Sequence, residues 1–336
     1  MSIVMKSSES VFPEFIGNQS ALQQLSEDIA AGRFPHALLL EGPTGCGKRT
    51  LARLLAKAAV CDSEGQRPCG VCAACKKAEN GSHPDITVID EDARTLSVDT
   101  VRDLRESAFI LPNEAAVRVV ILCDAQKMSL GAQNALLKIL EEPPRHLRFI
   151  LTCENRAQLL ATIRSRVTVV TLSGVEWDEA RPLLHARLPQ VDEETLEKAF
   201  AVSGGVIGQV LSGFEDDTLR RVLELAPRLC TALTAQNEWD FLALTAQLDK
   251  DKPAVTGVLS AMQLVFRDAL TLRYGGCATL STAPDVAKTL SARLSGARLM
   301  AMAEALEDLR QCQLRNMNQT LLLTRLCAVL RQAAVG

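Results

Sequence analysis

Near its N-terminus the chain reads Ala37-Leu38-Leu39-Leu40-Glu41-Gly42-Pro43-Thr44-Gly45-Cys46-Gly47-Lys48-Arg49-Thr50. In this stretch a short apolar run leads directly into a glycine-rich segment and a lysine. Such a run, without alternation, is typical of a strand buried on both faces of a parallel sheet. Glycines let backbone N–H groups curl around phosphates, and a lysine that opens the next helix reaches the phosphate oxygens. The stretch therefore predicts a phosphate-binding loop made by Gly42, Gly45, Gly47 and Lys48.

The residue after the lysine differs from the usual pattern of such loops. The pattern has Ser or Thr there, whose hydroxyl binds Mg²⁺, and this chain has Arg49. Thr50 lies about 100° further round the helix, so it is a poor replacement as a metal ligand, although it stays a candidate nucleotide-binding residue. These residues do not decide between an empty loop and a loop that holds ATP or ADP. They make Mg²⁺ doubtful at this site.

Further apolar runs alternate with helical stretches along the first half of the chain. The expected strands are Ala37–Leu40, Ile86–Ile89, Arg118–Leu122, Arg148–Thr152 and Val167–Leu172. The expected helices between them are Lys48–Val60, Val98–Ala108, Ser129–Leu140 and Arg156–Ile163. Strands separated by helices are the pattern of a covered parallel sheet, so residues 1–172 predict an α/β fold.

The third expected strand ends in Asp124, where hydrolysing phosphate-loop proteins carry the carboxylate that holds Mg²⁺. In those proteins a Glu normally follows to polarise the attacking water, and here Ala125 follows. Asp124 also suits a simple cap of the next turn, but the phosphate loop upstream favours a relict metal site. Together, Arg49 and Ala125 predict that this nucleotide fold has lost its hydrolytic chemistry.

Strand-like runs stop after residue 172. Helices are expected at Trp177–Leu188 and Glu193–Ser203, and from residue 216 the pattern is helical almost throughout. Aromatic residues make up only 4% of the chain, so its cores are built mainly from aliphatic side chains, which favours helices. We therefore expect three domains: the α/β domain over 1–172, a small helical domain over 173–212 and a helical bundle over 213–336.

The charge balance is nearly neutral, with 37 Lys and Arg against 40 Asp and Glu, for a net charge of −3. This argues against a protein whose whole surface binds nucleic acid. The first residues contain no long apolar run of a secretory signal, and no uninterrupted apolar run approaches the roughly 18 residues of a membrane span. We therefore expect a cytoplasmic protein without membrane contact.

Four of the eleven cysteines lie close together in the sequence: Cys61, Cys69, Cys72 and Cys75. Disulfides are rare in the cytosol, and four thiolates are enough for a closed tetrahedral Zn²⁺ site. An iron–sulfur cluster also takes four thiolates. A further alternative is that all four cysteines are buried and pack as small apolar residues. Polar neighbours such as Asp62 and Lys76 argue against it. The nearby His83 is superfluous as a ligand, and we interpret it as a loop residue.

Several motifs around the phosphate loop together resemble the bacterial clamp-loader family of AAA+ proteins. They are Gly17-Asn18-Gln19, Arg33-Phe34-Pro35-His36-Ala37, Ala132-Gln133-Asn134-Ala135-Leu136-Leu137-Lys138-Ile139-Leu140-Glu141-Glu142-Pro143-Pro144 and Thr162-Ile163-Arg164-Ser165-Arg166-Val167. The resemblance is dense over residues 12–212 and weaker beyond. The altered motifs single out the family's subunit that does not hydrolyse ATP itself.

This resemblance implies an AAA+ nucleotide-binding module, a helical lid and a helical collar for oligomerisation. It implies partners as well: the delta subunit and three copies of the gamma/tau ATPase, held together by a ring of five collars. The family's assembly opens the sliding clamp and loads it onto primed DNA. The family carries a zinc module at the place of residues 61–75, which favours structural zinc over an iron–sulfur cluster.

The resemblance also implies roles for single residues. Arg166, after Ser165, takes the position of an arginine finger that reaches the γ-phosphate on an adjacent gamma/tau subunit, an effect worth roughly 10³–10⁵ in rate. The alternative is a surface arginine paired with a carboxylate. Thr152 takes the family's first sensor position, and the alternative is a strand-end hydroxyl that caps the helix of Arg156. Gly208 stands where ATPase members of the family carry a sensing arginine. After Arg49 and Ala125, it is the third position that lacks a residue used in ATP hydrolysis.

Two other functions remain as alternatives. One is an active ATPase of the gamma/tau type, which the residues at 49, 125 and 208 argue against. The other is an independent zinc-containing protein that binds nucleic acid. Basic residues such as Arg102, Arg105 and Lys127 are scattered, and no aromatic platform for bases lies between them. We therefore expect at most backbone contacts with primed DNA, shared with other subunits.

Overall fold

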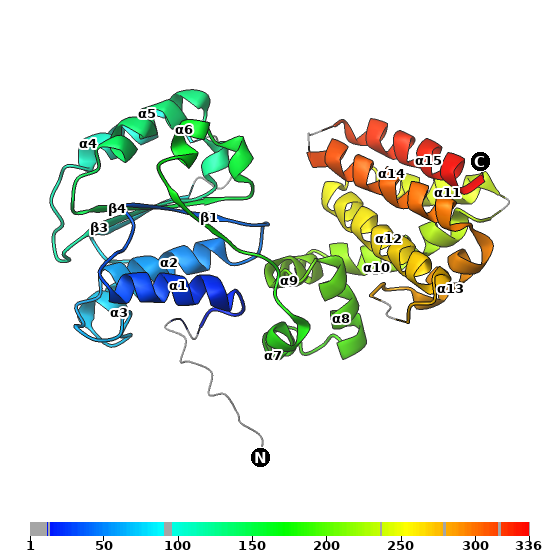
Figure 1. Cartoon of the computed structure of the whole chain (residues 1–336), viewed down its shortest axis with the longest axis horizontal. Helices are drawn as coiled ribbons and strands as arrows, with labels where there is room; N and C mark the ends of the chain where they lie inside the picture. Colours follow the sequence, from blue (N-terminus) through cyan, green and yellow to red (C-terminus); the bar gives the residue numbers. More distant parts are fainter. Residues whose placement is uncertain are drawn as a thin grey trace, which may run out of the picture. The chain divides into compact units, whose positions relative to one another are not determined.

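The computed structural model of the chain describes residues 12, 14–90, 96–235, 237–277, 280–314 and 317–335. Residues 1–11, 13 and 91–95 of the predicted α/β domain lie outside this set. The chain divides into two compact units, one that ends at Val175 and one that begins at Glu176. The first unit contains the sheet, and the second is helical (Figure 1).

The first unit is built on a parallel sheet. Its strands are β1 (Ala37–Glu41), β2 (Ile86–Ile89), β3 (Arg118–Leu122), β4 (Leu147–Cys153) and β5 (Thr168–Thr171). They lie in the order β2-β3-β4-β1-β5, and every neighbouring pair is parallel. The strands predicted from the apolar runs are confirmed. The neighbouring strands β1 and β4 are followed by helices on opposite faces of the sheet, α2 (Lys48–Ala59) and α6 (Ala161–Arg164) (Figure 1). The crevice at the carboxyl ends of two such strands is where open α/β sheets bind ligands.

Helices cover both faces of the sheet (Figure 1). One face carries α1 (Gln19–Ala30), α2 (Lys48–Ala59) and α3 (Ala73–Glu79), and the other carries α4 (Val98–Ser107), α5 (Leu130–Glu141) and α6 (Ala161–Arg164). Within β1, Leu38 and Leu40 pack into the core beneath α1 and α2, whereas Leu39 packs into the core beneath α4 and α5. Burial on both faces explains why the run has no polar alternation.

One predicted helix of the first unit is wrong. The pattern predicts a single helix over Arg156–Ile163, but the structure has a short 3-10 turn at Arg156–Gln158 and then α6. Between the two, Leu159 has extended dihedral angles and is buried in the core. The backbone N–H of Leu160 donates to Gln133 Oε1 at 2.9 Å. The buried leucine and this hydrogen bond fix the chain in an extended path that a helix cannot follow.

The second unit is helical throughout its described residues. Its helices are α7 (Trp177–Arg187), α8 (Glu193–Val202), α9 (Ile207–Glu215), α10 (Thr218–Ala232), α11 (Glu238–Ala246), α12 (Lys252–Arg273), α13 (Pro284–Arg293), α14 (Gly296–Leu314) and α15 (Gln319–Val335). The helices α7, α8 and α9 contact one another, and α9 also contacts α10. This confirms an all-helical region after the sheet. Its division into a lid over 173–212 and a collar over 213–336 stays a prediction.

Among the described residues, α12 is the one helix long and apolar enough to cross a membrane by length and composition. Half of its most apolar window is buried within the unit. It contacts α10, α13 and α14. Near its end, Asp268 is 1% exposed and its carboxylate accepts the backbone N–H groups of Leu280 and Ser281. In this structure α12 packs as the central helix of the second unit.

Candidate functional site

The glycine-rich loop lies between β1 and α2, at the carboxyl edge of the sheet. Gly45 and Gly47 have φ angles of +88° and +92°, which side-chain-bearing residues rarely adopt. A Cβ atom on Gly47 would lie 2.8 Å from the ring of Phe15. The backbone thus requires glycine at these places, and the loop ends where α2 begins at Lys48.

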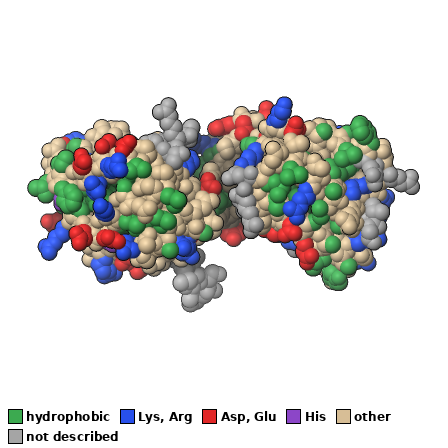
Figure 2. Space-filling model, turned by 90° about the horizontal axis from the view of Figure 1, so that it is seen from above, with side chains coloured by type: hydrophobic (Ala, Val, Ile, Leu, Met, Phe, Trp, Pro, Cys, Tyr) green, Lys and Arg blue, Asp and Glu red, His purple; other side chains and the backbone are tan. Residues whose placement is uncertain are grey.

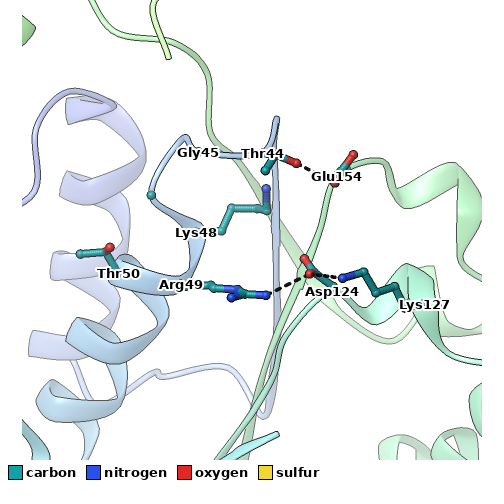
Figure 3. A pocket seen from close by; sticks show the side chains of 9 residues that line it. Thr44, Gly45, Lys48, Arg49, Thr50, Asp124, Lys127 and Glu154 are labelled. Atoms are coloured by element: carbon teal, nitrogen blue, oxygen red, sulfur yellow. Dashed lines mark hydrogen bonds and ion pairs between the residues drawn. The ribbon is translucent and has the colours of Figure 1, made fainter. Parts of the chain in front are cut away.

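A cavity of about 510 Å³ opens on this loop (Figure 3). It is lined by Thr44, Gly45, Gly47, Lys48, Arg49, Thr50, Asp124, Lys127 and Glu154. The Lys48 side chain is largely buried, and its Nζ donates to the carbonyl oxygens of Gly42 at 2.7 Å and Pro43 at 2.8 Å. The Thr44 hydroxyl donates to Glu154 Oε1 at 2.6 Å. Of the predicted nucleotide-binding residues, Gly45, Gly47, Lys48, Thr50 and Asp124 therefore meet at one cavity, and Gly42 does not line it.

Arg49 lies between two carboxylates. Its Nη2 is 2.8 Å from Asp90 Oδ1 and 3.1 Å from Asp124 Oδ2. Lys127 Nζ lies 3.0 Å from the same oxygen of Asp124, and Figure 3 shows the two cations reaching Asp124 from opposite sides. Burial would raise the pKa of Asp124, but the charges and hydrogen bonds of Lys127 and Arg49 lower it overall. The carboxylate at the end of β3 is therefore ionised and paired with protein cations.

The residues do not fit Mg²⁺. That ion needs oxygen ligands in near-octahedral geometry at about 2.0–2.1 Å. A metal in contact with both Asp90 and Asp124 would lie where the Arg49 guanidinium lies. Thr50 lines the same cavity but is a poor replacement ligand, because its side chain points away from that of Arg49 (Figure 3).

Thr152 lies at the end of β4 and does not line the cavity. It is fully buried, and its hydroxyl accepts the backbone N–H of Asp124 at 2.9 Å. Asp124 has a φ of +51°, a left-handed conformation that costs free energy for a residue with a side chain. The hydrogen bond from its N–H to Thr152 stabilises that turn. Gly208 lies in the first turn of α9, in the second unit.

The four clustered cysteines converge in space. Their Sγ atoms all lie within 4.8 Å of one another, and Cys61–Cys72 and Cys69–Cys75 are each 3.9 Å apart. A tetrahedral zinc ion with Zn–S bonds of about 2.3 Å has sulfur atoms about 3.8 Å apart. The observed spacing fits that geometry, so the cluster can bind zinc.

Backbone N–H groups point at the sulfur atoms of this cluster. The N–H groups of Cys69, Cys72 and Cys75 donate to the Sγ of Cys61, Cys69 and Cys72, at 3.4, 3.4 and 3.3 Å. Backbone hydrogen bonds from Cys72 and Val71 lower the pKa of the Cys69 thiol to about 6. His83 is not part of the cluster: it is buried, and its Nδ1 accepts the N–H of Asp85.

Arg166 follows α6 and lies beside a second, shallow cavity of about 610 Å³. This cavity is lined by His36, Leu140, Glu141, Pro143, Ser165, Arg166, Val167 and Thr168. Arg166 Nη2 is 2.8 Å from Glu141 Oε1, and Nη1 donates to Thr162 O at 2.9 Å. The two cavities share no lining residue, so among the described residues Arg166 belongs to a different surface from the phosphate loop.

Sequence reasoning missed four residues of these sites: Asp90, Lys127 and Glu154 at the loop, and Glu141 beside Arg166. Signals were available for two of them. Asp90 follows β2 as Asp124 follows β3, and the carboxyl ends of neighbouring parallel strands share one edge of the sheet. Lys127 also had a local signal, because it pairs with Asp124 three residues before it. Glu154 and Glu141 depend on contacts between segments whose spacing in the sequence has no fixed pattern.

Comparison with known proteins gives matches along most of the chain. Models described as "DNA polymerase III, delta subunit" and "DNA polymerase III, delta subunit, C terminal" match residues 17–176 and 223–331. DNA polymerase III subunit delta' of Escherichia coli K12 is 29% identical over 311 residues, which cover 90% of this chain and 91% of that protein.

Relatives of the gamma/tau type match a shorter part. DNA polymerase III subunit gamma/tau of Mycobacterium tuberculosis H37Rv is 39% identical over 168 residues, 49% of this chain and 29% of that protein. The chain thus spans about a third or less of this relative. Among solved structures, a gamma-subunit-related protein of Thermotoga maritima is similar with a TM-score of 0.45 at 19% identity, over 93% of this chain and 99% of that one.

Proposed function

The chain belongs to the DNA polymerase III delta-subunit family, and from this premise we propose that it is the delta' subunit of a clamp loader that does not itself hydrolyse ATP. In this role it helps to load the sliding clamp onto primed DNA. Its match to delta' runs through nearly the whole length of both proteins, which supports this assignment over the partial gamma/tau matches.

One observation carries the proposal: the guanidinium of Arg49 occupies the place between Asp90 and Asp124. Hydrolysis in phosphate-loop proteins needs a metal at that place, to bridge the β- and γ-phosphates and to neutralise the developing charge. A loop without that metal and without a Glu after Asp124 retains a phosphate cradle but lacks the hydrolytic machinery. ATP or ADP bound there would serve structure.

Arg166 supplies the catalytic contribution of the chain, to a neighbour. It lies apart from its own phosphate loop, at a cavity open to solvent, and its side chain is 33% exposed. In the assembly it exchanges Glu141 for the γ-phosphate on an adjacent gamma/tau subunit. There it stabilises the charge of the transition state, which is worth about 10³–10⁵ in rate in well-studied cases.

The remaining parts of the proposal concern zinc, partners and location. A structural Zn²⁺ is held by Cys61, Cys69, Cys72 and Cys75 and fixes the segment between α2 and α3. The second unit supplies the collar contacts to gamma/tau and delta. Primed DNA is reached through the complex, in the cytoplasm. On the face shown in Figure 2, acidic and basic side chains are interspersed, as expected for a subunit without a DNA-binding surface of its own.

An active ATPase of the gamma/tau type is the second candidate. It is favoured by the 39% identity to gamma/tau and by an intact glycine loop with Lys48. The two candidates differ in the purified chain alone. DNA-stimulated ATP turnover by the chain, abolished by Lys48→Ala, would establish the second candidate.

The proposal is tested by reconstituting the chain with gamma/tau, delta, clamp and primed DNA. With Arg166→Ala we expect the amount of ATP hydrolysed in a single turnover to fall by about the contribution of one gamma/tau site, because the finger is worth about 10³–10⁵ in rate. Clamp loading should fall with it. Arg164→Ala, an exposed arginine two residues earlier, is the matched control. Unchanged hydrolysis and loading with Arg166→Ala would show that this arginine is no finger.

A further inference from the structure

We propose that the phosphate loop of this chain binds a nucleoside diphosphate or triphosphate without a divalent cation, with Arg49 as the cation of the site. This rests on the part of the proposed function that assigns nucleotide to the loop. It adds that the ligand is the metal-free nucleotide.

The position of Arg49 carries the first step. Its Nη2 lies within 2.8 and 3.1 Å of oxygens from Asp90 and Asp124, the two carboxylates at the ends of β2 and β3. Each carboxylate side chain is only about one-fifth exposed, at 21% and 20%. The Arg49 side chain is itself 41% exposed, so water partly screens these pairs, but removing it would leave both carboxylates without this cation. A metal would have to displace Arg49 from both carboxylates to enter.

The charge of the cavity carries the second step. Lys48, Arg49 and Lys127 line it together with Asp124 and Glu154, and Asp90, which does not line it, also pairs with Arg49. Lys127 lies against Asp124 on the side opposite Arg49 (Figure 3), so the acidic group is flanked by two cations. A polyphosphate that enters meets ammonium and guanidinium groups where other phosphate loops offer a hydroxyl and a metal.

The chemistry of guanidinium carries the third step. A guanidinium is planar and always charged, and its fork of N–H donors matches phosphate as well as carboxylate. It can thus donate hydrogen bonds to phosphate oxygens, in place of the contacts that a metal ion would make. Lys48 has to turn from the carbonyl oxygens of Gly42 and Pro43 toward the phosphates, a local change in one side chain.

The test is a titration of the full-length chain with fluorescent N-methylanthraniloyl-ADP, in excess EDTA and in excess MgCl₂. We expect equal or weaker binding in Mg²⁺, because the metal must first leave the nucleotide. Arg49→Thr restores a hydroxyl ligand and uncovers both carboxylates, so its affinity should rise by about tenfold or more in Mg²⁺, or about 1.4 kcal/mol. Arg53→Thr makes the same charge change one turn later on α2 at an exposed position and should behave as the wild type.

Two results overturn the proposal. One is wild-type binding that strengthens by more than about twofold in Mg²⁺, which is outside the error of matched titrations. The other is the absence of binding in both buffers. Both are measured on the wild-type chain, so they do not depend on the folding of a variant. They are also separate from the Arg166 experiment, which reports on a neighbour's site and can succeed or fail independently.

Discussion

At the scale of single residues, the ion pair between Arg166 and Glu141 bears on the proposed finger, because the guanidinium must part from Glu141 before it can contact a neighbouring subunit. The two side chains are 33% and 49% exposed. Water screens such a pair, and exposed pairs contribute at most about 1 kcal/mol. A phosphate group on a neighbouring subunit therefore competes with a weak partner. In the separate chain Glu141 gives the guanidinium a charged partner, and breaking this pair requires little free energy.

Replacing Glu141 by Gln should make the finger more available. We expect clamp loading by the reconstituted complex at subsaturating ATP to rise by up to about fivefold, the equivalent of about 1 kcal/mol. Glu142→Gln, at the exposed neighbouring position, is the control and should leave the rate unchanged. A loss as large as that with Arg166→Ala would instead place Glu141 in the catalytic contact itself.

At the scale of elements, the cysteine segment joins α2 to α3, and its four thiol groups converge at one point. Removing zinc should therefore loosen this segment while the sheet stays intact. We expect elemental analysis to find zinc in the purified chain, and chelation to raise hydrogen exchange within residues 61–75 above that of β1 or β3. Cys72→Ser should lose the metal, and Cys277→Ser, at an exposed cysteine outside the cluster, should keep it. Iron in place of zinc, with visible absorption, would contradict the zinc assignment.

Another element depends on a buried carboxylate. Asp85, just before β2, is 3% exposed and accepts the backbone N–H groups of Asn113, Glu114 and Ala115 at 2.6, 2.8 and 2.8 Å. Burial would raise the pKa of Asp85, but these three hydrogen bonds lower it below its ordinary value of 3.8. The ionised group therefore stabilises the fold above that value. The contribution is lost as the pH falls through the lower, folded-state pKa.

Asp85→Asn should consequently destabilise the chain at neutral pH by about 1–3 kcal/mol, because buried N–H groups lose their charged acceptor. The difference from wild type should shrink at an acidic pH well below 3.8, as the wild-type carboxyl takes up its proton. Urea unfolding at both pH values measures this, with the exposed Asp103→Asn as control. Equal stability of Asp85→Asn and wild type at neutral pH would disprove the role of these hydrogen bonds.

The helices and strands also differ in how well the sequence predicts them. Runs such as Ala37–Leu40 predicted their strands, because burial on both faces leaves a continuous apolar signature. The four cysteines converged because their spacing is short. The helix predicted over Arg156–Ile163 is wrong, because the N–H of Leu160 donates to the side chain of Gln133, which is distant in sequence. Asp90 was missed because its role depends on the strand order, which places β2 beside β3.

At the scale of the whole molecule, each compact unit corresponds to a different kind of sequence signal. The first unit, to Val175, carries dense motifs, and its parallel sheet was predictable strand by strand. The second unit shows only helical periodicity, so its class was predictable but the contacts of α12 with α10, α13 and α14 were not. Helix-to-helix packing depends on side-chain shape along whole faces, and one sequence does not specify which faces meet.

The position of Arg49 has a consequence for supply. A metal cofactor is drawn from a shared pool, so depletion of the pool or a competing ion changes every site that depends on it. The guanidinium of Arg49 is covalently part of α2, so its concentration at Asp90 and Asp124 is constant. Under the proposed function, withdrawal of magnesium would stop the metal-dependent subunits of the assembly, while this chain would keep its internal cation. The nucleotide site of this chain would then not respond to the magnesium concentration, whereas the sites of the other subunits in the proposed assembly would.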